Sequence, residues 1–414
     1  MLAMRDVQQG NGKFTDIAPV RGGFGGVLWG SAGITVPWEV YLQYDDLSIL
    51  EEHYDAMAAY IDYLQTTINP ETGVSRDAQL GDWLGPQNNQ LGAPYLSTAY
   101  HIYDLDIMMK VAELLGKTAD KARFATMYKE RKSFFNSRFV NDEGKSMALL
   151  GGPGAFMAPP GSVPTWKEAN TQTSYAVGLA LGAFDDERLS VAGKHLDDAV
   201  KRKNVDDNGQ MLPEYSLMTG FIGTAWISKA LSDLGYDETA YRLLQNENYP
   251  SWIYPINQGA TSIWERLNSY TVENGFGGNN SMNSFNHYSF GAIGQWLMAY
   301  AAGIQRDEPG FKKFILQPKP DPSGQMTWAE GSYESIYGRI YSKWSKTDGG
   351  VEYDFIVPAN TSATLILENK NGAQILEGKL AADKAKGVSF LDSKDGKFKY
   401  HLSSGKYHFT VKNQ

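Results

Sequence analysis

Residues 47–64 read LSILEEHYDAMAAYIDYL, and they carry the clearest structural signal in the chain. Apolar side chains recur there at steps of three and four residues, the spacing that lines up one face of a helix. The stripe consists of Leu50, Tyr54, Met57, Ala58, Ile61 and Leu64. This stretch therefore predicts an amphipathic helix that buries one side against other elements.

The same period recurs from about residue 34 to residue 303. Loops rich in Gly, Pro and Asn separate the periodic segments, and no alternating strand pattern lies between them. Such a series predicts a mainly α domain in which helices pack on helices rather than on a parallel sheet. Helices are expected at 36–44, 47–67, 95–116, 119–139, 170–183, 185–203, 219–235, 237–246 and 282–304.

Beyond Arg306 the apolar pattern changes to a period of two. Residues 351–357 (VEYDFIV) and 397–402 (KFKYHL) mix β-branched and aromatic residues in near alternation, and an Asp-Gly turn precedes each of them. This pattern predicts a small antiparallel β-sandwich. Because a Pro-Gly pair breaks the chain just after the last helix, we expect a helical domain over 1–305 and a β-sandwich domain over 306–414.

The composition argues against several classes of protein. With 42% hydrophobic and 13% aromatic residues in 414 positions, the chain is too apolar to stay disordered and long enough for about two to three domains. A formal net charge of −9 without any basic block argues against a nucleic-acid partner. Because there is no Cys and the six His show no short ligand spacing, we expect neither a disulfide nor a metal site.

No run approaches ~18 consecutive apolar residues, so we expect no membrane partner. The first residues, MLAMRD, lack the charged region and apolar stretch of a signal peptide. The compartment stays open: cytoplasmic, or periplasmic or extracellular if a longer protein carries a leader upstream. The oligomeric state leaves no trace in the residues.

Three glycine-containing loops place a tryptophan beside polar groups. An indole offers a flat apolar face to a sugar ring, and 10 Trp, 24 Tyr and 18 Phe suit a carbohydrate-binding protein as well as a large α-protein core. The alternative for the second loop is that its Asp caps a helix and its Trp packs in the core. Three such loops in one domain favour a site, because sites accumulate on loops held by a rigid scaffold. The loops carry Trp29, then Asp82 and Trp83, then Trp264, Glu265 and Arg266.

Glu265 is the carboxylate most suited to move a proton. It lies between Trp264, whose indole would remove water from it, and Arg266, whose guanidinium would keep it ionised. A general base needs that ionised form. A plain Glu–Arg ion pair is the alternative. His287, in a loop of small and polar residues, is a candidate donor to a hydroxyl or else a structural hydrogen-bond partner.

A series of longer motifs runs along the chain. They are Leu28-Trp-Gly-Ser-Ala, Val36-Pro-Trp, Gly81-Asp-Trp-Leu, Leu217-Met-Thr-Gly-Phe, Asn248-Tyr-Pro-Ser-Trp, Gly259-Ala-Thr-Ser-Ile-Trp-Glu-Arg, Ser281-Met-Asn-Ser-Phe-Asn-His-Tyr-Ser-Phe-Gly-Ala, Glu308-Pro-Gly-Phe-Lys-Lys and Trp328-Ala-Glu-Gly-Ser-Tyr. In order and spacing they resemble the C-terminal portion of the catalytic region of α-L-rhamnosidases of glycoside hydrolase family 78. The likeness spans Arg5 to about His408.

This resemblance implies an (α/α)6 barrel followed by a β-sandwich, and hydrolysis of terminal α-L-rhamnose from plant-type glycosides with inversion, without metal or organic cofactor. The substrate would be a small-molecule or oligosaccharide rhamnoside. Inverting enzymes hold an acid and a base roughly 6.5–9.5 Å apart so that a water fits between them. By the resemblance Glu265 is the general base, Trp29 and Trp83 line the rhamnose subsite, and His287 reaches a sugar hydroxyl. Trp264, Asp82 and Arg266 are further substrate-binding or orienting candidates.

The chain also departs from the family pattern. The family's general acid lies in an Asp-Glu-Arg-x-Gly-Trp loop, which these 414 residues do not contain, and the expected helices are too few for six pairs. We therefore expect a barrel that lacks its first helices, and poor hydrolysis of rhamnosides whose leaving group needs a proton. The first candidates for a substitute acid are Glu39, Asp77, Asp82 and Glu214. The alternatives are a catalytically silent carbohydrate-binding or structural remnant, and a related (α/α)6 glycosidase for another sugar.

Overall fold

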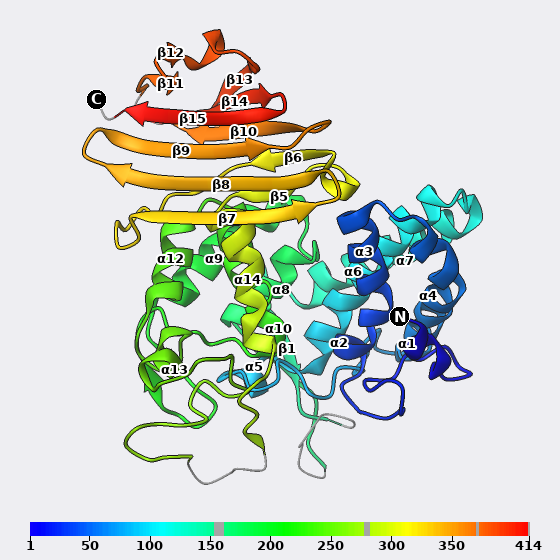
Figure 1. Ribbon diagram of the computed structural model, residues 1–414. Coiled ribbons are helices and arrows are strands. Elements are labelled where there is room, and N and C mark those ends of the chain that lie inside the picture. Colours follow the sequence, from blue (N-terminus) through cyan, green and yellow to red (C-terminus); the bar gives the residue numbers. More distant parts are fainter. Residues whose placement is uncertain (153–160, 277–281, 370–371, 413–414) are drawn as a thin grey trace. The chain divides into compact units, whose positions relative to one another are not determined.

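The structure is a computed structural model that describes residues 1–152, 161–276, 282–369 and 372–412 (Figure 1). Packing divides the chain into two compact units. The first unit comprises Met1–Glu39 and Leu47–Ala292, and the second comprises Val40–Asp46 and Ile293–Gln414. The domain boundary after residue 305 stays a prediction.

Helices dominate the first unit, as the period of the sequence predicts. The expected segments are present with ends shifted by a few residues, except that 219–235 divides into two helices. The α-helices are α1 (Leu2–Asp6), α2 (Val27–Gly30), α3 (Ala32–Tyr44), α4 (Ser48–Thr66), α5 (Asn88–Leu91), α6 (Ala93–Leu114), α7 (Thr118–Arg138), α8 (Gln172–Ala180), α9 (Leu189–Lys201), α10 (Phe221–Thr224), α11 (Ile227–Asp233), α12 (Asp237–Gln245) and α13 (Ile253–Asn257), with short 3-10 turns η1 (Asp186–Arg188) and η3 (Ser289–Ala292).

The stripe of α4 faces the core as expected. Leu50, Met57 and Ile61 are fully buried, and Tyr54 and Leu64 are nearly so, whereas Ala58 is half-buried. The neighbouring α6 is apolar almost all round, and most of its side chains are buried. A helix of that kind belongs in the centre of a helical unit, where other helices cover every face.

Short strands also occur in the first unit, where the sequence predicted none. The strand β1 (Met147–Leu150) pairs antiparallel with β2 (Thr165–Glu168), and β3 (Asn204–Val205) pairs with β4 (Met211–Leu212). Two to four residues are too few for an alternating pattern to stand out from loop sequence. These pairs are formed by tertiary context within the connections between the predicted helices.

The helix expected at 282–304 begins later and ends in a wider turn. Residues 283–288 form a loop of the first unit, and in the second unit α14 (Ile293–Trp296) continues into the π-type turn η4 (Leu297–Ala301). Among the described residues, two sheets follow, and Figure 1 shows their strands stacked as broad arrows. Their strands are β5 (Ile304–Arg306), β6 (Lys313–Leu316), β7 (Trp328–Ser335), β8 (Gly338–Thr347), β9 (Gly350–Val357), β10 (Ser362–Glu368), β11 (Ile375–Glu377), β12 (Leu380–Ala381), β13 (Val388–Lys394), β14 (Lys397–Leu402) and β15 (Gly405–Lys412).

Within the described part of the second unit, one sheet has the order β13-β14-β10-β6-β5 and the other β12-β11-β15-β9-β8-β7. Strand pairs are antiparallel as predicted, except that β10 runs parallel to β6. Alternate residues of β8, β9 and β10 are buried, so the inner faces of the two sheets supply one apolar core. Trp344 is fully buried in that core, and its indole N–H donates to the carbonyl of Ala301 at 2.8 Å.

Candidate active site

Trp29 lies on α2, a single helical turn that a glycine positions. The residue before the turn, Gly26, has φ of 69°, a left-handed conformation that glycine adopts without a steric penalty. The next backbone N–H, that of Val27, donates to the carbonyl of Asp77 at 2.7 Å, which fixes the start of the turn. The indole of Trp29 is consequently held at a defined place, half-buried and open on one side.

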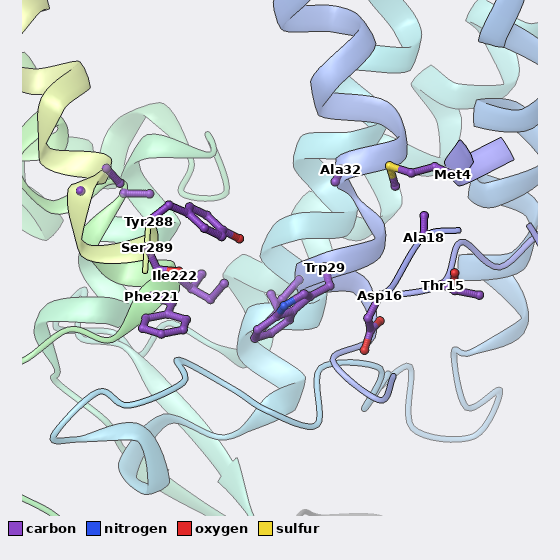
Figure 2. Close-up of a pocket in the computed structure, with 14 residues that line it drawn as sticks. Met4, Thr15, Asp16, Ala18, Trp29, Ala32, Phe221, Ile222, Tyr288 and Ser289 are labelled. Atoms are coloured by element: carbon purple, nitrogen blue, oxygen red, sulfur yellow. The ribbon is translucent and has the colours of Figure 1, made fainter. Parts of the chain in front are cut away.

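That open side faces a pocket of about 660 Å³ in the first unit. Figure 2 shows Trp29 on one side of the pocket and Phe221, Ile222 and Tyr288 on the other, with Asp16 near the indole. This volume falls within the 300–1,000 Å³ typical of small-molecule sites. Aromatic walls with a few polar groups between them suit the apolar and hydroxyl-bearing sides of a sugar ring.

Asp16 is the carboxylate that lines this pocket within the described residues, and no motif or pattern in the sequence indicated it. Its Oδ2 accepts from the backbone N–H of Gly25, while its Oδ1 is buried without a partner in the described part of the chain. Burial raises the pKa of Asp16, and the Gly25 N–H together with the charge of Lys13 opposes that rise. A buried oxygen without a partner is suited to accept a hydrogen bond from a ligand hydroxyl.

Asp82 does not reach the pocket directly but holds one of its walls. The carboxylate is 1% exposed, and α10 begins in front of it. Its Oδ2 accepts from the N–H of Gly220 at 2.7 Å and from the hydroxyl of Thr173, and its Oδ1 accepts from the N–H groups of Ile222 at 2.8 Å and Gly223 at 2.9 Å. Burial raises the pKa of Asp82, and these four donors oppose the rise. Asp82 thus caps α10, about 140 residues away in sequence, and not a helix that starts in its own loop as one of the two expectations held.

Trp83 joins the same two segments through its backbone. Its carbonyl accepts from the N–H of Phe221 at 2.9 Å. Its half-exposed indole lines neither the pocket of Trp29 nor the second pocket, which contains Arg266. Gly220 allows this close approach, because a Cβ at that position would overlap the carbonyl oxygens of Trp83 and Asp82. The 81–85 loop and the 219–223 turn are therefore clamped together by backbone groups and one carboxylate.

Glu265 lies where two loop segments pair. Its backbone N–H donates to the carbonyl of Ser284 at 2.8 Å, and its Oε2 accepts from the N–H of Ser284 at 3.0 Å. A further bond joins the N–H of His287 to the carbonyl of Ile263 at 2.8 Å, so the base candidate and His287 are carried by one paired unit. The carboxylate is half-buried, with one oxygen tied to the backbone.

The neighbours of Glu265 in sequence point to different surroundings. Trp264 is 6% exposed, and its ring packs edge-on against Phe285 with ring centroids 5.3 Å apart. Arg266 lines a second pocket, of about 240 Å³, and forms no ion pair with Glu265 among the described residues. The expected Glu–Arg pair is thus not formed there.

His287 stands beside the first pocket. Its ring lies 5.1 Å from that of Phe221 and stacks on Tyr288 at 5.9 Å, and both of those residues line the pocket. Ser281, the first residue of the motif that carries His287, lies outside the described residues. Tyr288 and Phe221 each belong to a motif noted in the sequence, yet neither was singled out, because an aromatic residue beside a polar one is equally typical of a core.

The four candidates for a substitute acid do not line the pocket that Trp29 faces. Asp77 pairs with Lys13, with Nζ and Oδ1 3.7 Å apart, and Asp82 is enclosed by protein donors. Glu39 and Glu214 are exposed.

A buried polar pair lies at the end of α2, the turn that carries Trp29. Ser31 Oγ donates to Oδ2 of Asp104 at 2.5 Å, and both residues are almost fully buried. Burial raises the pKa of Asp104 to about 8, and the Ser31 hydroxyl only partly opposes this. Asp104 is therefore protonated at neutral pH, and the family motif residue Ser31 serves the interior rather than the pocket.

In the residues that the structure describes, no three His, Asp or Glu side chains gather as a metal site. None of the described helices is long and apolar enough to cross a membrane.

Relatives of known structure share this fold. The α-L-rhamnosidase of Streptomyces avermitilis, solved as a complex with L-rhamnose, superposes with a TM-score of 0.83 at 28% identity and covers 99% of this chain. The α-L-rhamnosidase from Dictyoglumus thermophilum gives a TM-score of 0.81 at 27% identity over 100% of the chain. These matches cover 36% and 43% of those two longer chains.

Sequence comparisons agree. The chain is 30% identical to an α-L-rhamnosidase of Streptomyces avermitilis and 31% identical to one of Formosa agariphila, over 99% and 100% of its length. It spans 36% and 42% of these two proteins. Residues 1–301 match the bacterial α-L-rhamnosidase 6 hairpin glycosidase domain, and residues 303–381 match the bacterial α-L-rhamnosidase C-terminal domain. The chain therefore belongs to the bacterial α-L-rhamnosidase family of six-hairpin glycoside hydrolases.

Proposed function

We propose that this chain contributes the rhamnose pocket and the general base of an inverting α-L-rhamnosidase. The observation that carries the proposal is the pocket walled by Trp29 on one side and by Phe221 and Tyr288 on the other. The segment that supplies Tyr288 also carries His287 and is paired with Glu265. A rhamnose-bound relative with the same fold supports the choice of sugar.

In this proposal the rhamnose ring lies with its apolar side against the indole of Trp29. Asp16 Oδ1 accepts a hydrogen bond from one sugar hydroxyl, and His287 contacts another. These groups orient the anomeric carbon, because a ring held on several sides loses its freedom before reaction.

Glu265 then takes a proton from a water molecule while the water oxygen attacks the anomeric carbon from the face opposite the leaving group. The glycosidic C–O bond breaks, and the leaving oxygen takes a proton from an acid or from solvent. The configuration at the anomeric carbon is inverted by this single displacement. The backbone N–H of Ser284 keeps one oxygen of Glu265 in place, which leaves the other oxygen for the water.

The Glu265→Gln variant tests this role. The amide is the same size but takes no proton, so kcat on an aryl α-L-rhamnoside should fall by ~10²–10⁴ while the affinity for L-rhamnose changes less than about threefold. Trp29→Ala should show the opposite pattern: the affinity for L-rhamnose should fall more than kcat does. A Glu265→Gln protein that retains its turnover contradicts the assignment of the base.

A catalytically silent binding module is the second candidate function. The rates on aryl and alkyl rhamnosides distinguish it from an enzyme that lacks its general acid. If these 414 residues lack an acid, aryl rhamnosides with good leaving groups should react and alkyl rhamnosides should lag by ~10²–10⁴. Equal rates on the two substrate classes contradict the missing acid. Binding of L-rhamnose without turnover of either class identifies the silent module.

A further inference from the structure

The second pocket of the first unit is built around an arginine without a counter-charge. About 240 Å³ in volume, it is lined by apolar side chains and by Arg266, Tyr249 and Asn268. Arg266 Nε is buried, and it has no hydrogen-bond partner within the described residues. The side chain as a whole is half-buried and lines the pocket, and a cation among apolar walls is suited to a ligand that supplies oxygen atoms.

The acidic groups on the surrounding elements are already occupied. Asp206, whose charge acts on Tyr249, accepts from the backbone N–H groups of Asn208 at 2.9 Å and Gln210 at 2.8 Å within its own turn. The neighbouring Asp207 accepts from the N–H of Asn89 at 2.8 Å. Neither forms an ion pair with the arginine among the described residues.

One aromatic pair joins the linings of the two pockets. Phe221 lines the pocket of Trp29, Phe290 lines the pocket of Arg266, and their rings meet edge to face with centroids 5.5 Å apart. Apolar walls flank the guanidinium, because Leu84 and Leu267 also line the second pocket. A ligand in this pocket would contact apolar side chains and one planar cation, the guanidinium of Arg266.

We propose that the Arg266 pocket binds the carboxylate of an acidic sugar, a hexuronic acid, as a subsite distinct from the rhamnose pocket. The planar guanidinium fork matches the two oxygens of a carboxylate, and the apolar walls receive the C–H face of the ring. The volume, below the range of drug-sized ligands, admits a single sugar unit. The binding of the acidic sugar to this pocket does not depend on the proposed function. The further idea that this sugar is linked to the rhamnose in one glycoside rests on the proposed function.

The test is the binding of D-glucuronate to the 414-residue chain, followed by titration calorimetry or ligand-observed NMR, with D-glucose as the neutral control. We expect glucuronate to bind at least tenfold more tightly than glucose, and more weakly as salt rises, because a partly exposed charge pair is screened. Equal binding of the two sugars overturns the proposal. Tighter binding of inorganic sulfate than of glucuronate also overturns it, since the pocket would then select a tetrahedral oxyanion.

Variants locate the site. Arg266→Gln should weaken glucuronate at least tenfold and Arg266→Lys less, because an ammonium keeps the charge but loses the fork. Asn268→Asp, an isosteric change at an exposed position, should weaken it by like-charge repulsion even if Arg266 variants fold poorly. Arg242→Gln is the matched control, since Arg242 pairs with Glu238 on the surface. Unchanged affinity in a folded Arg266→Gln protein and in Asn268→Asp refutes the assignment.

Binding of L-rhamnose to the same samples separates this inference from the proposed function. If glucuronate binds and rhamnose does not, the rhamnose pocket is wrong and the acidic subsite stands. If rhamnose binds and Trp29→Ala abolishes it while glucuronate never binds, the acidic subsite is wrong and the proposed function stands.

Discussion

The clamp formed by Asp82 offers the sharpest test of how this fold holds its pocket. The Asp82→Asn substitution keeps the size of the side chain but turns one acceptor oxygen into an N–H2 group. The hydroxyl of Thr173 can rotate and accept from that amide. The backbone N–H of Gly220 cannot, so it is left facing another donor in a buried place.

The cost follows from these contacts. One buried N–H without an acceptor costs about 1–3 kcal/mol. The two bonds from Ile222 and Gly223 lose the charge on their acceptor, about 1 kcal/mol each, because charge-assisted bonds are roughly twice as strong as neutral ones. The lower cost of burying an amide offsets part of this. We expect Asp82→Asn to lower the free energy of unfolding of the first unit by about 3 kcal/mol.

Urea unfolding at pH 7, followed by far-UV circular dichroism and tryptophan fluorescence, measures this change. Asp185→Asn is the control, because Asp185 is exposed and its side chain forms no capping hydrogen bond, so its effect should stay within about 0.5 kcal/mol. Since the clamped turn carries Phe221, the affinity for rhamnose should fall as well. A loss of stability below about 1 kcal/mol for Asp82→Asn would refute the clamp.

Three other substitutions probe the interior. The pKa of Asp104 is raised to about 8, so between about pH 4 and pH 8 the unfolded chain has lost this proton and the folded chain has kept it. The stability of the folded protein therefore falls as pH rises, by up to about 1.4 kcal/mol per pH unit. In urea unfolding from pH 5 to pH 8, Asp104→Asn should become more stable relative to the wild type, and a difference in stability that stays constant over this range contradicts the reasoning. Gly220→Ala should lower the melting temperature and cost about 1–3 kcal/mol of stability, because the new Cβ overlaps the carbonyl oxygens of residues 82 and 83. Gly294→Ala, whose Cβ meets open space, should not lower the melting temperature. Trp344→Ala should destabilise the β-sandwich unit by about 3–5 kcal/mol in the unfolding transition seen by near-UV circular dichroism, and a loss under 1 kcal/mol would contradict its place in the core.

Local periodicity determined much of the fold. The stripe of residues 47–64 gave α4, because a step of 3.6 residues and burial on one side are properties of a segment by itself. The change to a period of two beyond residue 306 gave the sandwich for the same reason. The strands β1 to β4 and the parallel pairing of β10 with β6 were not predictable, since short pairs depend on partners far along the chain.

The site divides in the same way. The sequence by itself determined which residue types stand in the Trp-Glu-Arg and Asn-His-Tyr motifs, and these named the family and the candidate base. Only the tertiary structure decided what each side chain does: Asp82 caps α10, and Arg266 turns toward its own pocket. It also brought Asp16 into the pocket of Trp29. The physical reason is that a function depends on which groups face each other in the folded chain. Side chains that are neighbours in sequence point in different directions, so their surroundings are set by segments far away in the sequence.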